Sequence, residues 1–135
     1  MLFRSDEALA TYQAILQGSP KEANAYLGVA GIQLQRQDYR AATQTYEGLL
    51  SINPGNFQAL IGLSNLAMQQ KNYDQALDYL NQGMKANPRQ DSLYVKAASL
   101  YSLLGKPDVA RQNLQKALAL KPDNEEANYQ MGYIL

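Results

Sequence analysis

The chain has 135 residues, of which 46% are apolar, and its 12 basic residues balance its 12 acidic residues. A net charge of zero argues against nucleic acid or an anionic membrane surface as the main partner, because both attract clustered positive charge. Cysteine and histidine are absent, which excludes disulfides, zinc sites built on Cys or His, and catalytic triads with a histidine base. No apolar run approaches the roughly 20 residues that span a bilayer, so we expect no direct membrane insertion.

Two residue types recur every 34 residues along the whole chain. The prolines of this series are Pro20, Pro54, Pro88 and Pro122, and the alanines are Ala8, Ala42, Ala76 and Ala110. A large apolar residue follows each alanine four positions later, at Tyr12, Tyr46, Leu80 and Leu114. A period kept by independent residue types is the signature of a repeat array, so residues 1–135 are predicted to form a single array.

In chain order, residues 3–20 match only the second helix of a unit. Three complete units follow at residues 23–56, 57–90 and 91–124, and residues 125–135 match only the first helix of another. Within 23–56, apolar residues recur at helical spacing before and after a polar turn at 37–38, which predicts two helices. The other two units turn in the same way at 71–72 and 105–106. Proline closes each unit because it lacks an N–H donor and cannot continue a helix.

The two half-units have a consequence for assembly. Arrays of this kind are normally finished by polar capping helices, and neither half-unit has that character; the last one carries Tyr129, Tyr133, Ile134 and Leu135. The half-unit of one molecule could stack on the opposite half-unit of another, which is a heterologous contact. Head-to-tail self-association is therefore one hypothesis.

The alternation of helices, with Ala, a Tyr or Leu four residues later and a closing Pro, resembles the tetratricopeptide repeat. The first-helix pattern of that family appears three times, at Tyr26, Val29 and Ala30, at Leu60, Leu63 and Ser64, and at Tyr94, Ala97 and Ala98. The chain departs from the family in lacking Trp, in having Gln33 and Ala67 where Tyr is usual, and in having Pro107 in place of an inter-helix Tyr. The resemblance covers essentially all 135 residues. It implies an all-α fold, a right-handed α-solenoid of antiparallel helix pairs that forms the tetratricopeptide superhelix.

The resemblance also implies that the first helix of each unit lines the concave face of the superhelix. The matching positions are nearly uncharged, and they are Asn24, Leu27, Gly31, Leu34, Gln35, Gln58, Ile61, Asn65, Met68, Gln69, Ser92, Val95, Ser99, Ser102, Glu126, Tyr129 and Tyr133. Aliphatic anchors at Leu27, Ile61 and Val95, surrounded by amides and hydroxyls, suit an extended peptide or a short helix. The alternative is that these aliphatic side chains only pack against neighbouring helices.

Family members that hold the acidic tails of chaperones use a clamp of Lys, Asn and Arg side chains on the same helices. The residues at the clamp positions of this chain are Leu27, Gly31, Gly62, Ser92 and Lys96. One basic residue does not make a clamp, which argues against a chaperone-tail adaptor.

No group of residues supports catalysis, a cofactor or a metal site. The acidic pairs Asp6-Glu7 and Glu125-Glu126 stand in the first turns of predicted helices, where acids favour the positive end of the helix dipole. The glycines of residues 28–31 fall inside a predicted helix and not between a strand and a helix, so they do not form a phosphate loop. We therefore expect no catalytic residue, no cofactor and no metal in this chain.

The function that follows is a non-catalytic scaffold that binds a protein or peptide. Two alternatives are a substrate-recruiting arm of a larger enzyme and a self-assembling structural array. The amide-rich, cysteine-free composition favours a bacterial envelope protein, such as one from pilus assembly or exopolysaccharide secretion, over a cytoplasmic one.

Overall fold

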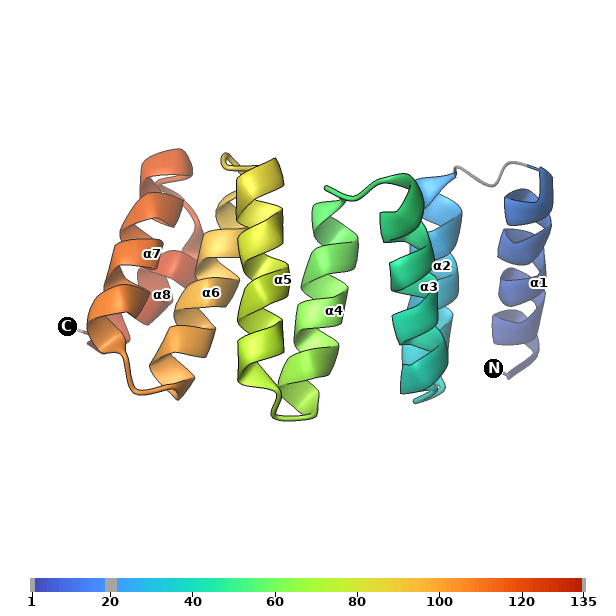
Figure 1. Ribbon diagram of the computed structural model, residues 1–135, viewed down its shortest axis with the longest axis horizontal. Helices are drawn as coiled ribbons and strands as arrows, with labels where there is room; N and C mark the ends of the chain where they lie inside the picture. The colour runs from blue at the N-terminus through green and yellow to red at the C-terminus, as the bar shows by residue number, and fades with distance from the viewer. Residues whose placement is uncertain (1, 19–21, 135) are drawn as a thin grey trace.

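The described part of the chain, residues 2–18 and 22–134 of a computed structural model, consists of eight α-helices (Figure 1). The helices are α1 (Leu2–Gly18), α2 (Ala23–Gln35), α3 (Tyr39–Ile52), α4 (Phe57–Gln69), α5 (Tyr73–Ala86), α6 (Asp91–Leu103), α7 (Pro107–Leu120) and α8 (Glu125–Ile134). Side chains are described for residues 6–18 and 22–132. No strand occurs among the described residues, so the predicted all-α fold is confirmed.

The helices stack in chain order along the long axis of the molecule, from α1 at one end to α7 and α8 at the other (Figure 1). The most extensive packing joins α2 to α3, α4 to α5 and α6 to α7, and each of these pairs also packs on the next. An array in which each unit contacts only its neighbours is a solenoid. This arrangement confirms the predicted solenoid of helix pairs.

The turns inside the three pairs occupy equivalent positions. Gln37 and Lys71 adopt positive φ angles of 61° and 62°, and Gly105 has a φ of 73°. This left-handed conformation ends a helix, and glycine adopts it with little cost. Asp38 and Asn72 then cap the following helices, where their side chains accept hydrogen bonds from the backbone N–H of Ala41 and Gln75. In the first two pairs the cap residues thus mark where the second helix starts, whereas glycine marks the end of the first helix only at Gly105.

Small residues lie where the helices of a pair cross. Ala42, Ala76 and Ala110 are fully buried, and the hydroxyl of Ser64 donates a hydrogen bond of 3.0 Å to the carbonyl oxygen of Ala76. Large apolar side chains surround these crossings and form three core clusters along the solenoid, with Leu49, Leu80 and Leu114 among their members. The core is therefore built from the same kinds of residue in each pair. The side chains that differ between pairs lie at the junctions from one pair to the next.

Candidate functional site

The predicted concave-face residues lie on the first helices α2, α4, α6 and α8, and we call this set the first-helix face. The exposed members are Asn24, Gln35, Gln58, Asn65, Gln69, Ser102, Glu126 and Tyr129. The half-buried members are Leu27, Gly31, Leu34, Ile61, Met68, Ser92 and Ser99. The side chain of Tyr133 lies outside the described residues. Most of the set is therefore accessible, and a partner could contact it.

Val95 is the exception, and its prediction as an exposed anchor is wrong. Its side chain is only 4% exposed and belongs to the core cluster that includes Ala98, Ala110 and Ala127. The other members of this cluster come from α6, α7 and α8, so Val95 is part of the packing among these three helices. Leu27 and Ile61 are half-buried and also pack partly against core clusters, so the alternative of inter-helix packing holds for Val95 fully and for these two in part.

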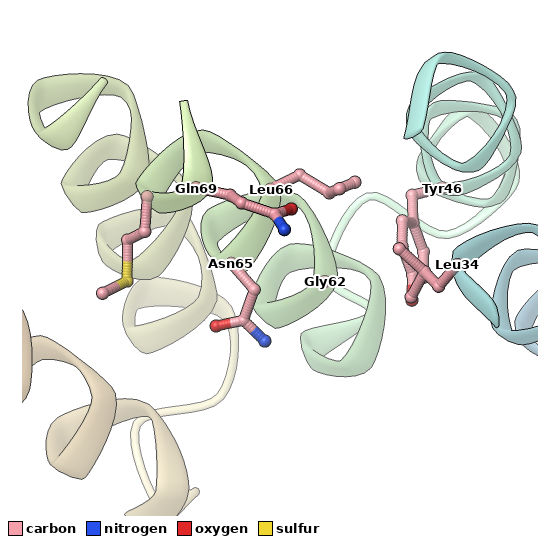
Figure 2. A pocket seen from close by; sticks show the side chains of 7 residues that line it. Leu34, Tyr46, Gly62, Asn65, Leu66 and Gln69 are labelled. Atoms are coloured by element: carbon pink, nitrogen blue, oxygen red, sulfur yellow. The ribbon is translucent and has the colours of Figure 1, made fainter. Parts of the chain in front are cut away.

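A pocket of about 460 Å³ opens on the first-helix face between the α2–α3 pair and α4. We call it the Tyr46 pocket, and its lining residues are Leu34, Tyr46, Gly62, Asn65, Leu66, Met68 and Gln69. Figure 2 shows Tyr46 and Leu34 on one side, facing Asn65, Gln69 and Gly62 of α4. Leu34, Asn65, Met68 and Gln69 were expected on the face; the structure adds the other three.

The Tyr46 ring and Gly62 form the junction beside this pocket. A Cβ atom placed on Gly62 would come within 2.6 Å of Tyr46 Cε2 and 2.8 Å of its Oη, which is too close for any real side chain. Glycine is therefore what admits the aromatic ring between α3 and α4. Tyr12 and Gly28 repeat the arrangement between α1 and α2, where the corresponding Cβ–Cε2 distance is also 2.6 Å.

The next junctions use different residues at the same positions of the 34-residue register. Leu80 stands where Tyr46 does and Lys96 stands where Gly62 does, and the last junction has Leu114 and Gln130. Tyrosine thus accompanies glycine, whereas leucine accompanies a long side chain. This pairing across 16 residues is a signal in the sequence, and it was missed because Tyr46 alone reads as an ordinary core residue.

The first helices are also spaced differently along the array. Helix α6 packs directly on both α4 and α8, and the packing between α2 and α4 is weaker. Farther along, Gln130 of α8 donates a hydrogen bond of 2.9 Å to the Ser99 hydroxyl of α6. A direct side-chain hydrogen bond therefore joins α6 and α8 on this face, whereas the Tyr46 pocket lies between the α2–α3 pair and α4.

Polar groups at the Tyr46 pocket carry no charge. Helices α2 and α4 contain no Asp, Glu, Lys or Arg. Among the described residues, the Tyr46 hydroxyl and the Asn65 amide have no hydrogen-bond partner, and the Gln69 amide makes one long hydrogen bond of 3.4 Å to the Tyr39 hydroxyl. Burial raises the pKa of the Tyr46 phenol, which keeps its proton available for donation. The pocket therefore offers apolar walls and neutral donors and acceptors.

Leu103 is a further exposed apolar residue that was not among the predicted concave-face residues. Leu103 is 62% exposed at the end of α6, at the register position that Gln35 and Gln69 occupy in the earlier units. The 34-residue period alone would have placed it on the first-helix face. Leu103 adds an apolar contact to the part of that face where Val95 is lost.

Two searches of the described residues bear on other kinds of site. No helix there is long and apolar enough to cross a membrane. Nor do the described Asp and Glu side chains gather in groups of three or more that could hold a metal ion.

Comparisons with known proteins place the chain in a family. Three models described as tetratricopeptide repeat match it, at residues 33–100, 4–57 and 91–124. A search of the curated proteins finds no match.

Solved structures with the same arrangement of helices are numerous. A crystal structure of MamA has a TM-score of 0.78 at 18% identity, covering 96% of this chain and 76% of that one. A structure of PilF from Pseudomonas aeruginosa has a TM-score of 0.85 at 19% identity, covering 98% of this chain and 60% of that one. The first tetratricopeptide domain of Spaghetti (RPAP3), bound to the HSP90 peptide SRMEEVD, has a TM-score of 0.75 at 20% identity, covering 86% of this chain and 91% of that one.

At these identities the solved structures support the fold and nothing finer. The family models add the sequence evidence, since the match over residues 33–100 alone covers half of the chain and the three matches together extend from residue 4 to residue 124. The chain belongs to the tetratricopeptide repeat family.

Proposed function

We propose that this chain is a non-catalytic scaffold that binds an uncharged segment of another protein on its first-helix face, centred on α2 and α4. The observation that carries the proposal is the run of two helices without a single charged residue, which flank an open pocket with neutral polar groups. A protein surface that stays uncharged over two helices and keeps apolar side chains accessible resembles the core of an interface, where charged residues are depleted.

The charge of the face also restricts the partner. The similar domain of Spaghetti is bound to a peptide with two glutamates and a terminal aspartate. Neither helix carries a basic side chain, and Arg36 at the end of α2 already pairs with Asp6. An acidic segment on α2 and α4 would therefore lose hydration without gaining a free basic partner on these helices, and an unpaired buried charge is costly. A segment rich in apolar and amide side chains avoids that cost, so the partner of this chain is expected to differ in charge from that peptide.

Selection of binders from a library of short random peptides tests the proposal. We expect the selected peptides to be poor in charged residues. The double variant Asn65→Asp/Gln69→Glu should weaken their binding by about tenfold or more, which corresponds to about 1.4 kcal/mol. The matched control is Asn81→Asp/Gln82→Glu, which adds the same charge at exposed positions of α5 and should bind as the wild type does. Selection of acidic or basic peptides, or equal binding by the two double variants, would contradict the proposal.

Self-association is a second candidate. It is supported by apolar side chains on the first and last helices, since Ile15 of α1 is 40% exposed and Tyr129 of α8 is 67% exposed. Sedimentation across a concentration series should then show growing oligomers, and Tyr129→Glu should abolish them. A monomer at every concentration would remove this candidate.

The proposed setting is the bacterial envelope, and its support is the amide-rich and cysteine-free composition. Fractionation of cells that express the protein at its native level would test it, because recovery in the cytoplasmic fraction alone would contradict it.

A further inference from the structure

We infer that the Tyr46 pocket is a specificity subsite that takes one large apolar side chain from an uncharged partner segment, with the Tyr46 hydroxyl donating a hydrogen bond to a backbone carbonyl next to that side chain. This inference rests on the proposed function and gives it a recognition element. It selects one position of the face, the α2–α4 gap, over all the others.

Apolar walls and size define what enters. Leu34, Leu66 and Met68 line the pocket together with the Tyr46 ring, and Met side chains adapt their shape to aromatic and aliphatic guests alike. Its volume of about 460 Å³ lies within the range of pockets that bury a sizeable ligand group, roughly 300–1,000 Å³. A large side chain with its adjoining backbone fills such a space, whereas an alanine side chain leaves most of it to water.

The polar atoms define how the guest is held. Tyr46 is only 8% exposed, yet its hydroxyl has no hydrogen-bond partner among the described residues and lines the pocket. The hydroxyl oxygen is itself accessible to solvent, so an acceptor on a ligand can replace water as its partner. The exposed amide of Asn65 also lacks a partner and offers both a donor and an acceptor. Backbone carbonyl and N–H groups of an extended segment match these two side chains.

The absence of charged residues on α2 and α4 disfavours charged side chains in the pocket. With no charged residue on α2 or α4, a Lys or Glu side chain in the pocket would be desolvated without an opposite charge. The chain also supplies an internal contrast on the other side of α4. There a smaller pocket of about 230 Å³ is lined by Glu47, Gln70, Gln75 and Tyr79 among others, and the two pockets share Leu66. That smaller pocket is more polar and includes a carboxylate, so an uncharged apolar side chain is expected to choose the Tyr46 pocket.

The test uses capped amino-acid amides and the full chain. Binding is followed by NMR through the methyl groups of Leu34 and Met68, which line the Tyr46 pocket and not the smaller one. N-acetyl-phenylalaninamide and N-acetyl-leucinamide should shift these signals in a saturable way. The alanine, lysine and glutamate analogues should bind at least about tenfold more weakly, since burying an unpaired charge or losing apolar contact costs at least 1.4 kcal/mol. Equal binding of the alanine analogue, or shifts confined to Leu63 and Ala67 of the smaller pocket, would overturn the subsite.

Two variants distinguish binding in the subsite from nonspecific hydrophobic binding elsewhere on the surface. Tyr46→Phe keeps the ring and removes the hydroxyl, so affinity for the phenylalanine amide should fall about three- to tenfold, while the far-UV circular dichroism stays unchanged. Asn65→Asp should admit the lysine amide, and the control Asn81→Asp on α5 should not. No change in either variant would overturn the inference.

The outcome is distinguishable from failure of the proposed function. If selected peptides bind through Asn65 and Gln69 but the capped amides leave Leu34 and Met68 unshifted, the scaffold function stands and the subsite falls. If the phenylalanine amide binds in the pocket but no peptide is selected on the face, the subsite stands as a site without the proposed segment.

Discussion

The junction between α3 and α4 and the junction between α5 and α6 occupy the same register of the array but are built differently. The first places the Tyr46 ring against Gly62 and leaves a pocket next to it. The second has the fully buried Leu80 and the half-buried Lys96 at the same positions. The two junctions thus differ in the side chains at these two positions, while their place in the 34-residue register is the same.

The end of the array sharpens this contrast. Between α6 and α8, Val95 is buried and Ser99 accepts a hydrogen bond from Gln130. Between α2 and α4, Asn65 keeps its amide unpaired among the described residues. A polar side chain that makes no hydrogen bond within the chain is available to bind another molecule. By this criterion the α2–α4 region is suited to recognition, and the α6–α8 region is suited to stabilising the solenoid.

The largest effect should come from truncating a buried side chain at the α5–α6 junction. Leu80→Ala removes a fully buried side chain and should lower the free energy of unfolding by about 2–5 kcal/mol, because a cavity remains. Leu34→Ala serves as the comparison beside the α3–α4 junction, which we call open because the Tyr46 pocket lies next to it. It should cost clearly less, since its half-buried side chain packs on the Tyr46 cluster and already borders the pocket. Urea unfolding followed by circular dichroism measures both. Equal losses would mean that the two junctions do not differ in packing.

Two glycines of the same helix should respond with opposite signs. Gly28→Ala in α2 drives a methyl group into the Tyr12 ring and should destabilise the fold by about 1 kcal/mol through overpacking. Gly31→Ala meets no atom within 4 Å and should stabilise the fold by about 0.5–1 kcal/mol, because alanine loses less backbone entropy in a helix. Thermal or urea unfolding decides; the same sign for both variants would argue against the ring-over-glycine junction.

The smallest effect is a pH dependence of stability. Burial raises the pKa of the Tyr46 phenol above the ordinary value of 10.0, so the folded state holds this proton more tightly than the unfolded chain does. The resulting stabilisation is fully present below about pH 10 and is lost as the pH rises through the folded pKa. Relative to Tyr46→Phe, the wild type should therefore lose stability above about pH 10. A difference between the two proteins that stays constant up to the alkaline limit of folding would contradict a buried phenol.

Much of the fold was predictable from the sequence, because the prolines and the buried alanines keep one period and helical spacing repeats inside it. The division into units at 23–56, 57–90 and 91–124 stays a prediction. The candidate site was predictable only in part. Asn65 and Met68 follow from the register, but Val95 is buried in the cluster that α6 forms with α7 and α8, and that burial depends on tertiary packing. The role of Tyr46 depends on Gly62, which is distant in sequence and adjacent in space.

The turns inside the helix pairs were also only partly predictable from the sequence. Gly105 marks its turn by residue type, whereas Gln37 and Lys71 adopt the same positive φ without any glycine signal. Their conformation follows from the stacked pairs around them, and a local reading of the residues does not contain it.

A double-mutant cycle on Tyr46 and Gly62 tests the central claim most directly. In the wild type, Gly62→Ala should lower the free energy of unfolding by about 1–3 kcal/mol, because the methyl group meets the Tyr46 ring. In a Tyr46→Leu background, which copies the residue at position 80, the same change should raise it by about 0.5–1 kcal/mol through helix propensity alone. A change of sign is the predicted result. An effect of equal sign and size in both backgrounds would contradict the claim that an aromatic ring over glycine builds the open junction.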